Sequence, residues 1–258
     1  SSAWYIWDRT KPWTLRGKGV GYAEGAEPNP VNITGYGKWP DRIVEAFDGC
    51  LFSTGNHGRH LVGGDGGWYH PATRERGSYR AELENYNVRD LRTLDAGRRV
   101  VWSAVSREGR GAVLFVVDAA TRRIVRKVEF SVEGGDPGLI MPAGPAAVLG
   151  VVRAPRKDGK TGAEVQETLV YRLDVDSGSV QFQKRVPGRA FTGPIDTDYV
   201  STSREISVGP DGCGWFFIDR DLVRVHADGM VEKVKAMPHG ARLVWIGNDL
   251  YLYNGGRQ

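Results

Sequence analysis

The chain has 258 residues, of which 40% are hydrophobic and 26% charged, and its formal net charge is +4. This balance is typical of a soluble globular protein, and no apolar run approaches the roughly 20 residues of a membrane span. Lysine and arginine do not gather into one stripe, so nucleic-acid binding is not expected. The two cysteines, Cys50 and Cys213, cannot form a disulfide framework and are expected to be small buried residues.

A strand–turn–strand pattern recurs five times along the chain. The polar turns are marked by Asp8, His70, Asp118, Asp174 and His226. Five units in 258 residues average about 52 residues, the length of a four-stranded propeller blade with its loops. The predicted fold class is therefore all-β, a β-propeller of four-stranded antiparallel blades, with residues 1–258 as a single domain.

Four blades follow one another in the middle of the chain. Blade one is predicted from Arg42–Phe47, Cys50–Thr54, Gly67–His70 and Ser78–Leu83, and blade two from Val88–Leu94, Val100–Ser106, Ala112–Val117 and Ile124–Phe130. Blade three is predicted from Gly138–Pro142, Ala146–Val152, Thr168–Leu173 and Val180–Val186, and blade four from Glu205–Val208, Gly214–Ile218, Leu222–Val225 and Met230–Val234. Turns such as Asp48-Gly49 and Gly209–Gly212 separate the strands, because glycine accepts positive φ angles.

The two ends of the chain are predicted to share a fifth blade. Residues 241–258 contain a hairpin of two strands, Arg242–Gly247 and Leu250–Asn254, and residues 1–16 supply Trp4–Asp8 and Trp13–Arg16. Such a blade would close the ring and leave no open sheet edge. Loss of Ser1–Arg16 is then expected to destroy cooperative folding, because large aromatic side chains would leave the core. The alternative is an excised fragment whose further blades lie elsewhere, and the start at Ser1 without Met leads us to expect one domain of a larger protein.

Two stretches resemble known propeller repeats. Leu114–Phe130 resembles the strand–Asp–Ala–Ala–Thr–strand hairpin of the quinoprotein-like, NHL-like and two-component-regulator-like propeller superfamily. Val208–Phe216 is similar to the unit in which an Asp-Gly turn precedes an aromatic strand. The resemblance implies the propeller fold and leaves the activity open, because these propellers host enzymes, sensors and binding scaffolds.

The candidate site lies in the loops of one face. The five turn markers are interpreted as structural, because short polar side chains satisfy local backbone donors. On the opposite face, loops that join successive blades or the second and third strands of a blade bring together aromatic and polar residues. The candidate ligand-binding residues are Tyr36, Trp39, Arg59, Asp196 and Asp198. The first hypothesis is therefore a glycan- or protein-binding module of an extracytoplasmic bacterial protein, secreted or periplasmic.

The alternative hypothesis is a carbohydrate-active enzyme, a polysaccharide lyase or a glycoside hydrolase. The catalytic candidates are His57, His60, Tyr199, Arg204 and His239. A histidine would be the base or a metal ligand, Tyr199 the acid or base, and Arg59 or Arg204 the clamp for a substrate carboxylate. No cofactor is predicted, and His57, His60 and His239 are the candidates for binding a divalent metal.

Overall fold

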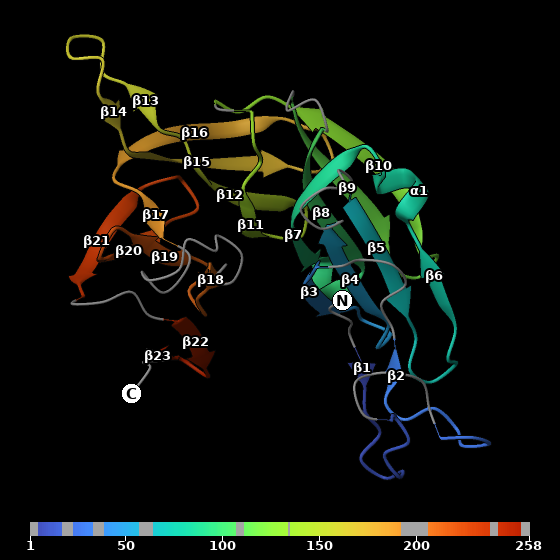
Figure 1. Cartoon of the computed structure of the whole chain (residues 1–258). Helices are drawn as coiled ribbons and strands as arrows, with labels where there is room; N and C mark the ends of the chain where they lie inside the picture. The colour runs from blue at the N-terminus through green and yellow to red at the C-terminus, as the bar shows by residue number, and fades with distance from the viewer. Residues whose placement is uncertain are drawn as a thin grey trace.

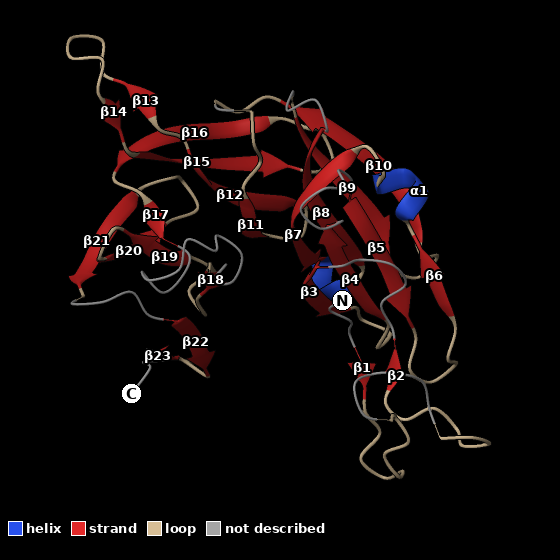
Figure 2. Ribbon diagram, in the orientation of Figure 1, coloured by secondary structure: helices blue, strands red, loops and turns tan. Residues whose placement is uncertain are grey.

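The computed structural model describes residues 5–16, 23–32, 39–56, 64–106, 111–133, 135–191, 206–237 and 242–253. Strands make up nearly all of the regular structure (Figure 2). The sheets follow one another in chain order around an arc, with the N-terminal strands at one end and the C-terminal hairpin at the other (Figure 1). No helix among these described residues is long and apolar enough to cross a membrane.

Blade one is an antiparallel sheet in chain order, as predicted, but its fourth strand is short. It consists of β3 (Trp39–Glu45), β4 (Leu51–Asn56), β5 (Gly64–Tyr69) and β6 (Arg76–Ser78). The predicted strand Ser78–Leu83 is wrong beyond Ser78, because α1 (Arg80–Leu83) follows. Tyr79 and Leu83 are both buried, and their spacing of four residues puts both side chains on one face of a helical turn. The ring of Tyr79 packs edge-on against Trp102 at 4.8 Å between centroids.

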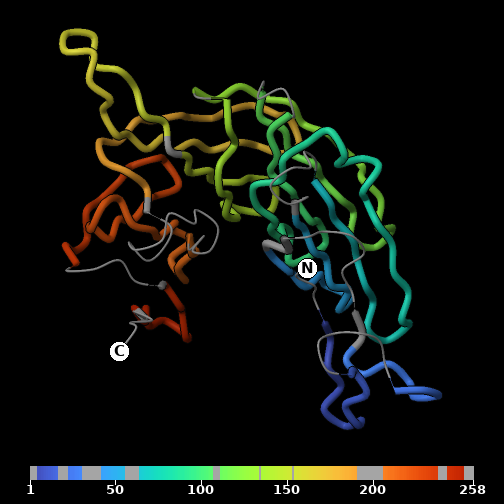
Figure 3. Tube along the Cα trace, viewed as in Figure 1, coloured from blue at the N-terminus to red at the C-terminus, as the bar shows by residue number. Residues whose placement is uncertain are grey.

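Blades two and three match the prediction closely. Blade two consists of β7 (Tyr86–Leu94), β8 (Arg99–Ser106), β9 (Ala112–Asp118) and β10 (Arg123–Phe130), with the 3-10 turn η2 (Asp95–Gly97) between β7 and β8. Blade three consists of β11 (Leu139–Pro142), β12 (Ala147–Arg153), β15 (Glu167–Asp174) and β16 (Val180–Pro187). A small hairpin of β13 (Arg156–Lys157) and β14 (Glu164–Val165) projects between β12 and β15, as the tube trace shows (Figure 3).

Blade four has a divided inner strand. Its regular part consists of β19 (Gly214–Ile218), β20 (Asp221–Val225) and β21 (Val231–Ala236). On the inner edge of β19, β17 (Ala190–Phe191) pairs with Phe217 and Ile218, and β18 (Ser207–Val208) pairs with Gly214 and Trp215. The described residues 190–191 and 207–208 therefore both lie along the inner edge of β19.

Hydrophobic cores lie between successive sheets. One buried cluster joins blades one and two through Phe52 and Trp102, and a second joins blades two and three through Leu114 and Tyr171. A third cluster joins blades three and four through Leu149 and Phe216. The apolar strands of blades two and three are buried on both faces because a neighbouring sheet covers each face. This face-to-face packing of four-stranded sheets is the arrangement of propeller blades.

The C-terminal hairpin continues the series beyond blade four. It consists of β22 (Arg242–Ile246) and β23 (Asp249–Tyr253), and Leu243 packs with Phe217 and Leu222 of blade four. Its two-residue turn is Gly247-Asn248, one residue earlier than predicted. At the other end of the chain, β1 (Tyr5–Ile6) pairs with β2 (Val31–Asn32). Among the described residues no N-terminal strand pairs with the hairpin, so ring closure and the count of five blades stay predictions.

Two of the predicted turn markers hold the turns between the third and fourth strands. The Asp118 Oδ1 accepts hydrogen bonds from the amide and the hydroxyl of Thr121, both at 2.7 Å. The Asp174 Oδ1 does the same for Ser177, at 2.7 and 2.8 Å. These bonds favour the charged carboxylate, and backbone donation first of all lowers the pKa of both aspartates below the ordinary value of 3.8. The structural interpretation of these two markers is confirmed.

Replacing Asp174 by alanine is expected to lower the free energy of unfolding by about 1 kcal/mol near neutral pH, because the turn loses its acceptor. A lowered folded pKa stabilises the protein above the unfolded pKa, and this contribution disappears as the pH falls through the folded pKa. The difference between wild type and variant should therefore shrink as the pH is lowered from about 5 toward about 2. Urea denaturation across this range measures it. A difference that is independent of pH would contradict a role for the charged carboxylate.

Candidate functional site

Most of the site residues predicted from sequence lie outside the described residues. His57, Arg59 and His60 follow β4, Tyr36 precedes β3, and Asp196, Asp198, Tyr199 and Arg204 lie between β17 and β18, while His239 precedes β22. Trp39 opens β3, where its backbone lies opposite Asn56. The proposed roles of these ten residues in ligand, substrate or metal binding stay predictions. Among the described residues, no group of three or more histidine, cysteine or acidic side chains is placed to hold a metal ion.

The glycine-rich stretch Thr54–Gly66 is shorter as a loop than the sequence suggests. β4 continues to Asn56 and β5 begins at Gly64, with Gly55 opposite Asp65. Asp65 is buried, and its Oδ1 accepts a hydrogen bond from the amide of Gly66 at 2.8 Å. The two strands are longer because glycines at 64 and 66 allow close approach: a Cβ at Gly64 would lie 2.7 Å from a Val88 methyl carbon.

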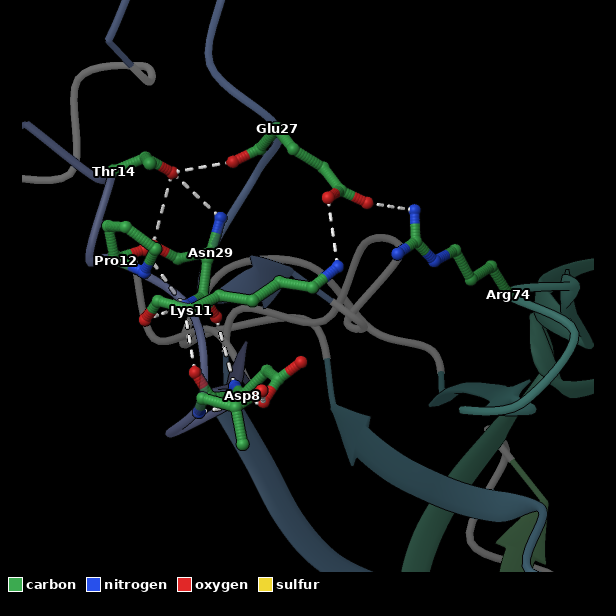
Figure 4. A network of polar contacts seen from close by, with 8 residues as sticks. Asp8, Lys11, Pro12, Thr14, Glu27, Asn29 and Arg74 are labelled. Atoms are coloured by element: carbon green, nitrogen blue, oxygen red, sulfur yellow. Dashed lines mark hydrogen bonds and ion pairs between the residues drawn. The ribbon is translucent and has the colours of Figure 1, made fainter.

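A separate hydrogen-bonded unit forms at the N-terminus, and we call residues 5–16 and 23–32 the N-terminal unit. Its centre is the buried Asn29 (Figure 4). The Asn29 Oδ1 accepts the amide of Asp8 at 2.9 Å, and Nδ2 donates to the carbonyls of Asp8, Lys11 and Pro12, each at 2.9 Å. The hydroxyl of Thr14 accepts the Asn29 amide at 2.8 Å. One side chain thus organises a loop that has few apolar contacts of its own.

An ion pair joins this unit to blade one. The Glu27 carboxylate pairs with Lys11 at 2.9 Å within the unit and with Arg74 in the turn between β5 and β6 (Figure 4). Hydrogen bonds from these two cations lower the pKa of Glu27. All three side chains are well exposed, so this attachment contributes little to stability.

The N-terminal unit displays aromatic rings to solvent. Trp7 and Trp13 are 53% and 59% exposed, and Tyr5 is 40% exposed. The two indoles contact each other with 6.0 Å between centroids and an interplanar angle of 70°. Trp13 Nε1 donates to the carbonyl of Leu15 at 2.9 Å, which fixes that indole while leaving its ring exposed. The sequence interpretation placed these aromatics in blade strands, so it missed the exposed surface. The cluster Pro28-Asn29-Pro30 is a turn signal, and it argues against placing this segment in a blade strand.

The chain without residues 1–32 is expected to keep a cooperative thermal transition within about 4 °C of the full chain, the equivalent of about 1 kcal/mol. The reason is that none of the four buried clusters of the described residues contains a residue before Val44. Circular dichroism melting of the two proteins measures the difference. Loss of the cooperative transition would instead support closure of the ring by the N-terminal strands.

A buried charge network crosses the innermost strands. Asp90 in β7 is fully buried, and its carboxylate pairs with Arg42 of β3 at 2.8 Å and Arg92 at 3.2 Å. It also accepts the amide of Ile140 in β11 at 3.0 Å. Arg92 donates from Nε to the carbonyl of Ile140 at 2.8 Å and from Nη2 to that of Ile206 at 3.4 Å. Five residues thus link the inner edges of four successive blades.

An open hollow of about 640 Å³ lies where the first and second strands of the four blades are joined. Its walls are Glu45–Phe47, Thr93–Gly97, Pro142–Pro145, Val208 and Gly212. Asp95 and Ala96 have φ angles of 51° and 50°, a region that residues with a Cβ seldom adopt. Phe47 is 53% exposed. This hollow lies at the opposite ends of the strands from Trp39 and Asn56, the ends at which the sequence predicted the ligand site.

Solved structures resemble this chain in fold. The Dos1 propeller superposes with a TM-score of 0.53 and 7% identity, over 81% of this chain and 52% of that one. An acylaminoacyl peptidase from Pyrococcus horikoshii superposes with a TM-score of 0.48 and 12% identity, over 76% of this chain and 32% of the peptidase chain. The β-propeller domain of the Trilobed protease from Pyrococcus furiosus superposes with a TM-score of 0.46 and 13% identity, over 85% of this chain and 70% of the protease domain. No protein-family model and no curated protein matches the sequence.

These findings define the class of the protein. The antiparallel four-stranded sheets, the cores between them and the likeness to the Dos1 propeller show a β-propeller module. The resemblance to propeller repeats read from the sequence is confirmed. Identities this low show the fold alone, and the chain spans about a third of the peptidase and about half of the Dos1 chain.

Proposed function

We propose that this β-propeller module binds a partner protein through the N-terminal unit. The observation that supports the proposal is the pair of exposed tryptophans, Trp7 and Trp13, on a loop that Asn29 holds in place. Tryptophan, tyrosine and arginine are the residues that contribute most to protein–protein affinity. The same unit exposes Tyr5, and its two arginines, Arg9 and Arg16, are also exposed. An exposed aromatic surface, in a unit that also exposes two cations, fits an apolar patch with acidic residues at its edge.

The geometry favours a protein over a glycan. Successive sugar rings would stack best on aromatic faces that lie in one plane. The indoles of Trp7 and Trp13 are inclined at 70°, so they offer one face and one edge instead of a common platform. An irregular aromatic protrusion of this kind fits a pocket on a folded partner. The expected secreted or periplasmic location is part of the proposal, and cell fractionation tests it.

The experiment compares proteins retained by the immobilised wild-type chain and by two variants. Trp13→Ala removes an exposed ring of the N-terminal unit, and Phe47→Ala removes a similarly exposed ring at the hollow. A partner of the proposed kind is retained by wild type and by Phe47→Ala, and its affinity for Trp13→Ala is about thirtyfold weaker, as roughly 2 kcal/mol implies. Its association rate should fall with salt because of Arg9 and Arg16.

Two outcomes would contradict the proposal. Equal binding by wild type and Trp13→Ala, with loss in Phe47→Ala, would place the partner at the hollow. Binding to an array of immobilised glycans that depends on Trp13, with no protein retained, would make the unit a glycan-binding surface. The alternative of a lyase or hydrolase depends on His57, His60 and other residues that lie outside the described part of the chain, and so does the binding of a divalent metal. The enzyme and the metal site both stay predictions.

A further inference from the structure

Blades one and four carry the same short combination of residues. In each, an Asp-Gly-Cys turn joins the first two strands and a histidine marks the turn after the third strand: Asp48–Cys50 with His70, and Asp211–Cys213 with His226. The backbones correspond as well, because the amide of each cysteine donates to the aspartate Oδ1 at 3.0 Å. Both thiols are free. The two sites therefore differ mainly in what surrounds the sulfur.

The two histidines point to different partners. His70 is used by its own turn, since its Nδ1 accepts the amide of Thr73 at 3.2 Å. His226 faces the thiol instead, with 3.8 Å between its Nδ1 and the Sγ of Cys213. The other ring nitrogen of His226, Nε2, lies 3.2 Å from a carboxylate oxygen of Glu232. Within the part of the chain that the structure describes, a continuous thiol–imidazole–carboxylate chain is thus found in blade four alone.

This order of groups can activate a thiol. The Glu232 carboxylate is a hydrogen-bond acceptor, so it favours the tautomer in which Nε2 carries the hydrogen and Nδ1 is unprotonated. That nitrogen then accepts the proton of Cys213, and the thiolate is the nucleophilic form of the sulfur. The carboxylate also stabilises the resulting imidazolium, as the third member of a catalytic triad does.

The charges around Cys213 complete the site. The Arg224 guanidinium pairs with Asp211 at 2.9 Å and lies 3.8 Å from Glu232. A hydrogen bond to Cys213 is the first cause of the raised pKa of Arg224, so a cation borders the sulfur. Cys50 has a comparable arginine, Arg122, and yet burial raises the pKa of its thiol. Arginine is therefore common to both sites, and among the described residues the histidine–carboxylate pair is found at Cys213 alone.

The two cysteines also differ in their exposure to solvent. Cys50 is completely buried, whereas Cys213 keeps 6% of its surface exposed. His226 and Arg224, the groups that border the thiol of Cys213, are 23% and 31% exposed at their side chains. The preceding residue, Gly212, is exposed and lines the open hollow. Cys213 is therefore closer to solvent than Cys50.

We propose that Cys213 is a site of reversible thiolation by low-molecular-weight disulfides. The Cys213 thiolate attacks one sulfur of the disulfide, a new S–S bond forms, and the original S–S bond breaks. The departing thiolate takes the proton that His226 accepted from Cys213. The disulfide is the oxidant, so the step needs no other reactant, and an excess of small thiol reverses it.

The test incubates the folded chain with oxidised glutathione and follows the added glutathionyl group by intact mass and peptide mapping. We expect one group on Cys213 and none on Cys50, and the reaction should remain in Cys50→Ser and vanish in Cys213→Ser. His226→Gln should slow it at least about tenfold, because proton acceptance by the imidazole is lost. The matched change His70→Gln in blade one should leave the rate unchanged. Glu232→Gln should slow it less than His226→Gln does.

Controls separate activation from exposure. In urea the two cysteines should react at equal rates, which gives the reference for the folded ratio. Melting curves of each variant show whether the fold is kept. Equal rates at Cys50 and Cys213 in the folded chain, or an unchanged rate in a folded His226→Gln variant, would overturn the proposal.

Discussion

Replacing Asp90 by alanine is expected to lower the free energy of unfolding by about 3–5 kcal/mol. The carboxylate is fully buried and holds two guanidinium groups, those of Arg42 and Arg92. Without it, both cations stay at the inner strands with their counter-charge gone, and the amide of Ile140 loses its acceptor. Removing one member of a buried ion pair costs far more than the pair itself contributes, because the remaining charge is left uncompensated.

Two further variants test this reasoning. Asp90→Asn keeps the shape and one acceptor oxygen but removes the charge. Its decrease in the free energy of unfolding should therefore lie between that of Asp90→Ala and zero. Asp176→Ala removes an exposed pair, in which Arg99 and Asp176 are 33% and 53% exposed. Such a surface pair contributes less than about 1 kcal/mol. Urea denaturation measures the free energy of unfolding of all three variants, and their m-values should equal that of the wild type. A loss below 1 kcal/mol for Asp90→Ala would mean that water replaces the carboxylate at the inner strands.

The strands of blades two and three could be predicted because their sequence signal is local. Ala112–Val117 is a continuous apolar run, and Val100–Val105 is apolar except for Ser103, as expected for strands covered on both faces. The Asp-Gly turns were equally local, and Gly49 and Gly212 do adopt φ angles of 80° and 73°. The one-turn helix after β6 was missed because four residues are too few to show a helical period.

The polar centres could not be predicted because their partners are far apart in the chain. Asp90 is one acidic residue in the mixed polar and apolar strand Val88–Leu94, and nothing near it indicates that Arg42, from another blade, neutralises it. The Asn29 side chain forms a hydrogen bond with Asp8, 21 positions earlier. The sequence around the aromatic N-terminal segment therefore does not distinguish it from a blade strand. The candidate loops chosen from sequence stay untested, since they lie outside the described residues.

A local signal for the two kinds of histidine was present in the sequence. Asp118 and Asp174 are each followed, three residues later, by a hydroxyl residue whose amide they accept. His70 is followed in the same way by Thr73, and its ring takes the place of the carboxylate. His226 is followed by Gly229 instead. The lack of a hydroxyl at that position indicates a histidine free to face Cys213.

Replacing Gly150 by alanine is expected to cost about 3 kcal/mol, at the upper end of what added core atoms usually cost. Gly150 lies in the middle of β12, directly opposite Tyr171 of β15. The ring of Tyr171 lies over the glycine, and an added Cβ would overlap its ring atoms and its hydroxyl oxygen. Glycine in a strand interior marks such a close approach.

The tyrosine cannot move away, which is why the cost should be high. Tyr171 is fully buried, its hydroxyl donates to the carbonyl of Pro137 at 2.6 Å, and Phe130 packs against its ring at 5.7 Å between centroids. Burial first of all raises the pKa of this hydroxyl far above 10, so the tyrosine stays neutral. A shift of the ring would break that hydrogen bond and open space in the core between blades two and three.

A double-mutant cycle with Tyr171→Leu separates the clash from other effects of alanine. Tyr171→Leu alone removes core volume and should cost about 2–4 kcal/mol. Once the ring is gone, adding Gly150→Ala should cost almost nothing, so the two changes should be non-additive by about 3 kcal/mol. Gly159→Ala, in the projecting hairpin, meets no atom within 4 Å and should change stability by less than about 0.5 kcal/mol. Additive losses in the cycle would show that Gly150 is required for its backbone conformation, and that the contact with Tyr171 is not the reason for a glycine there.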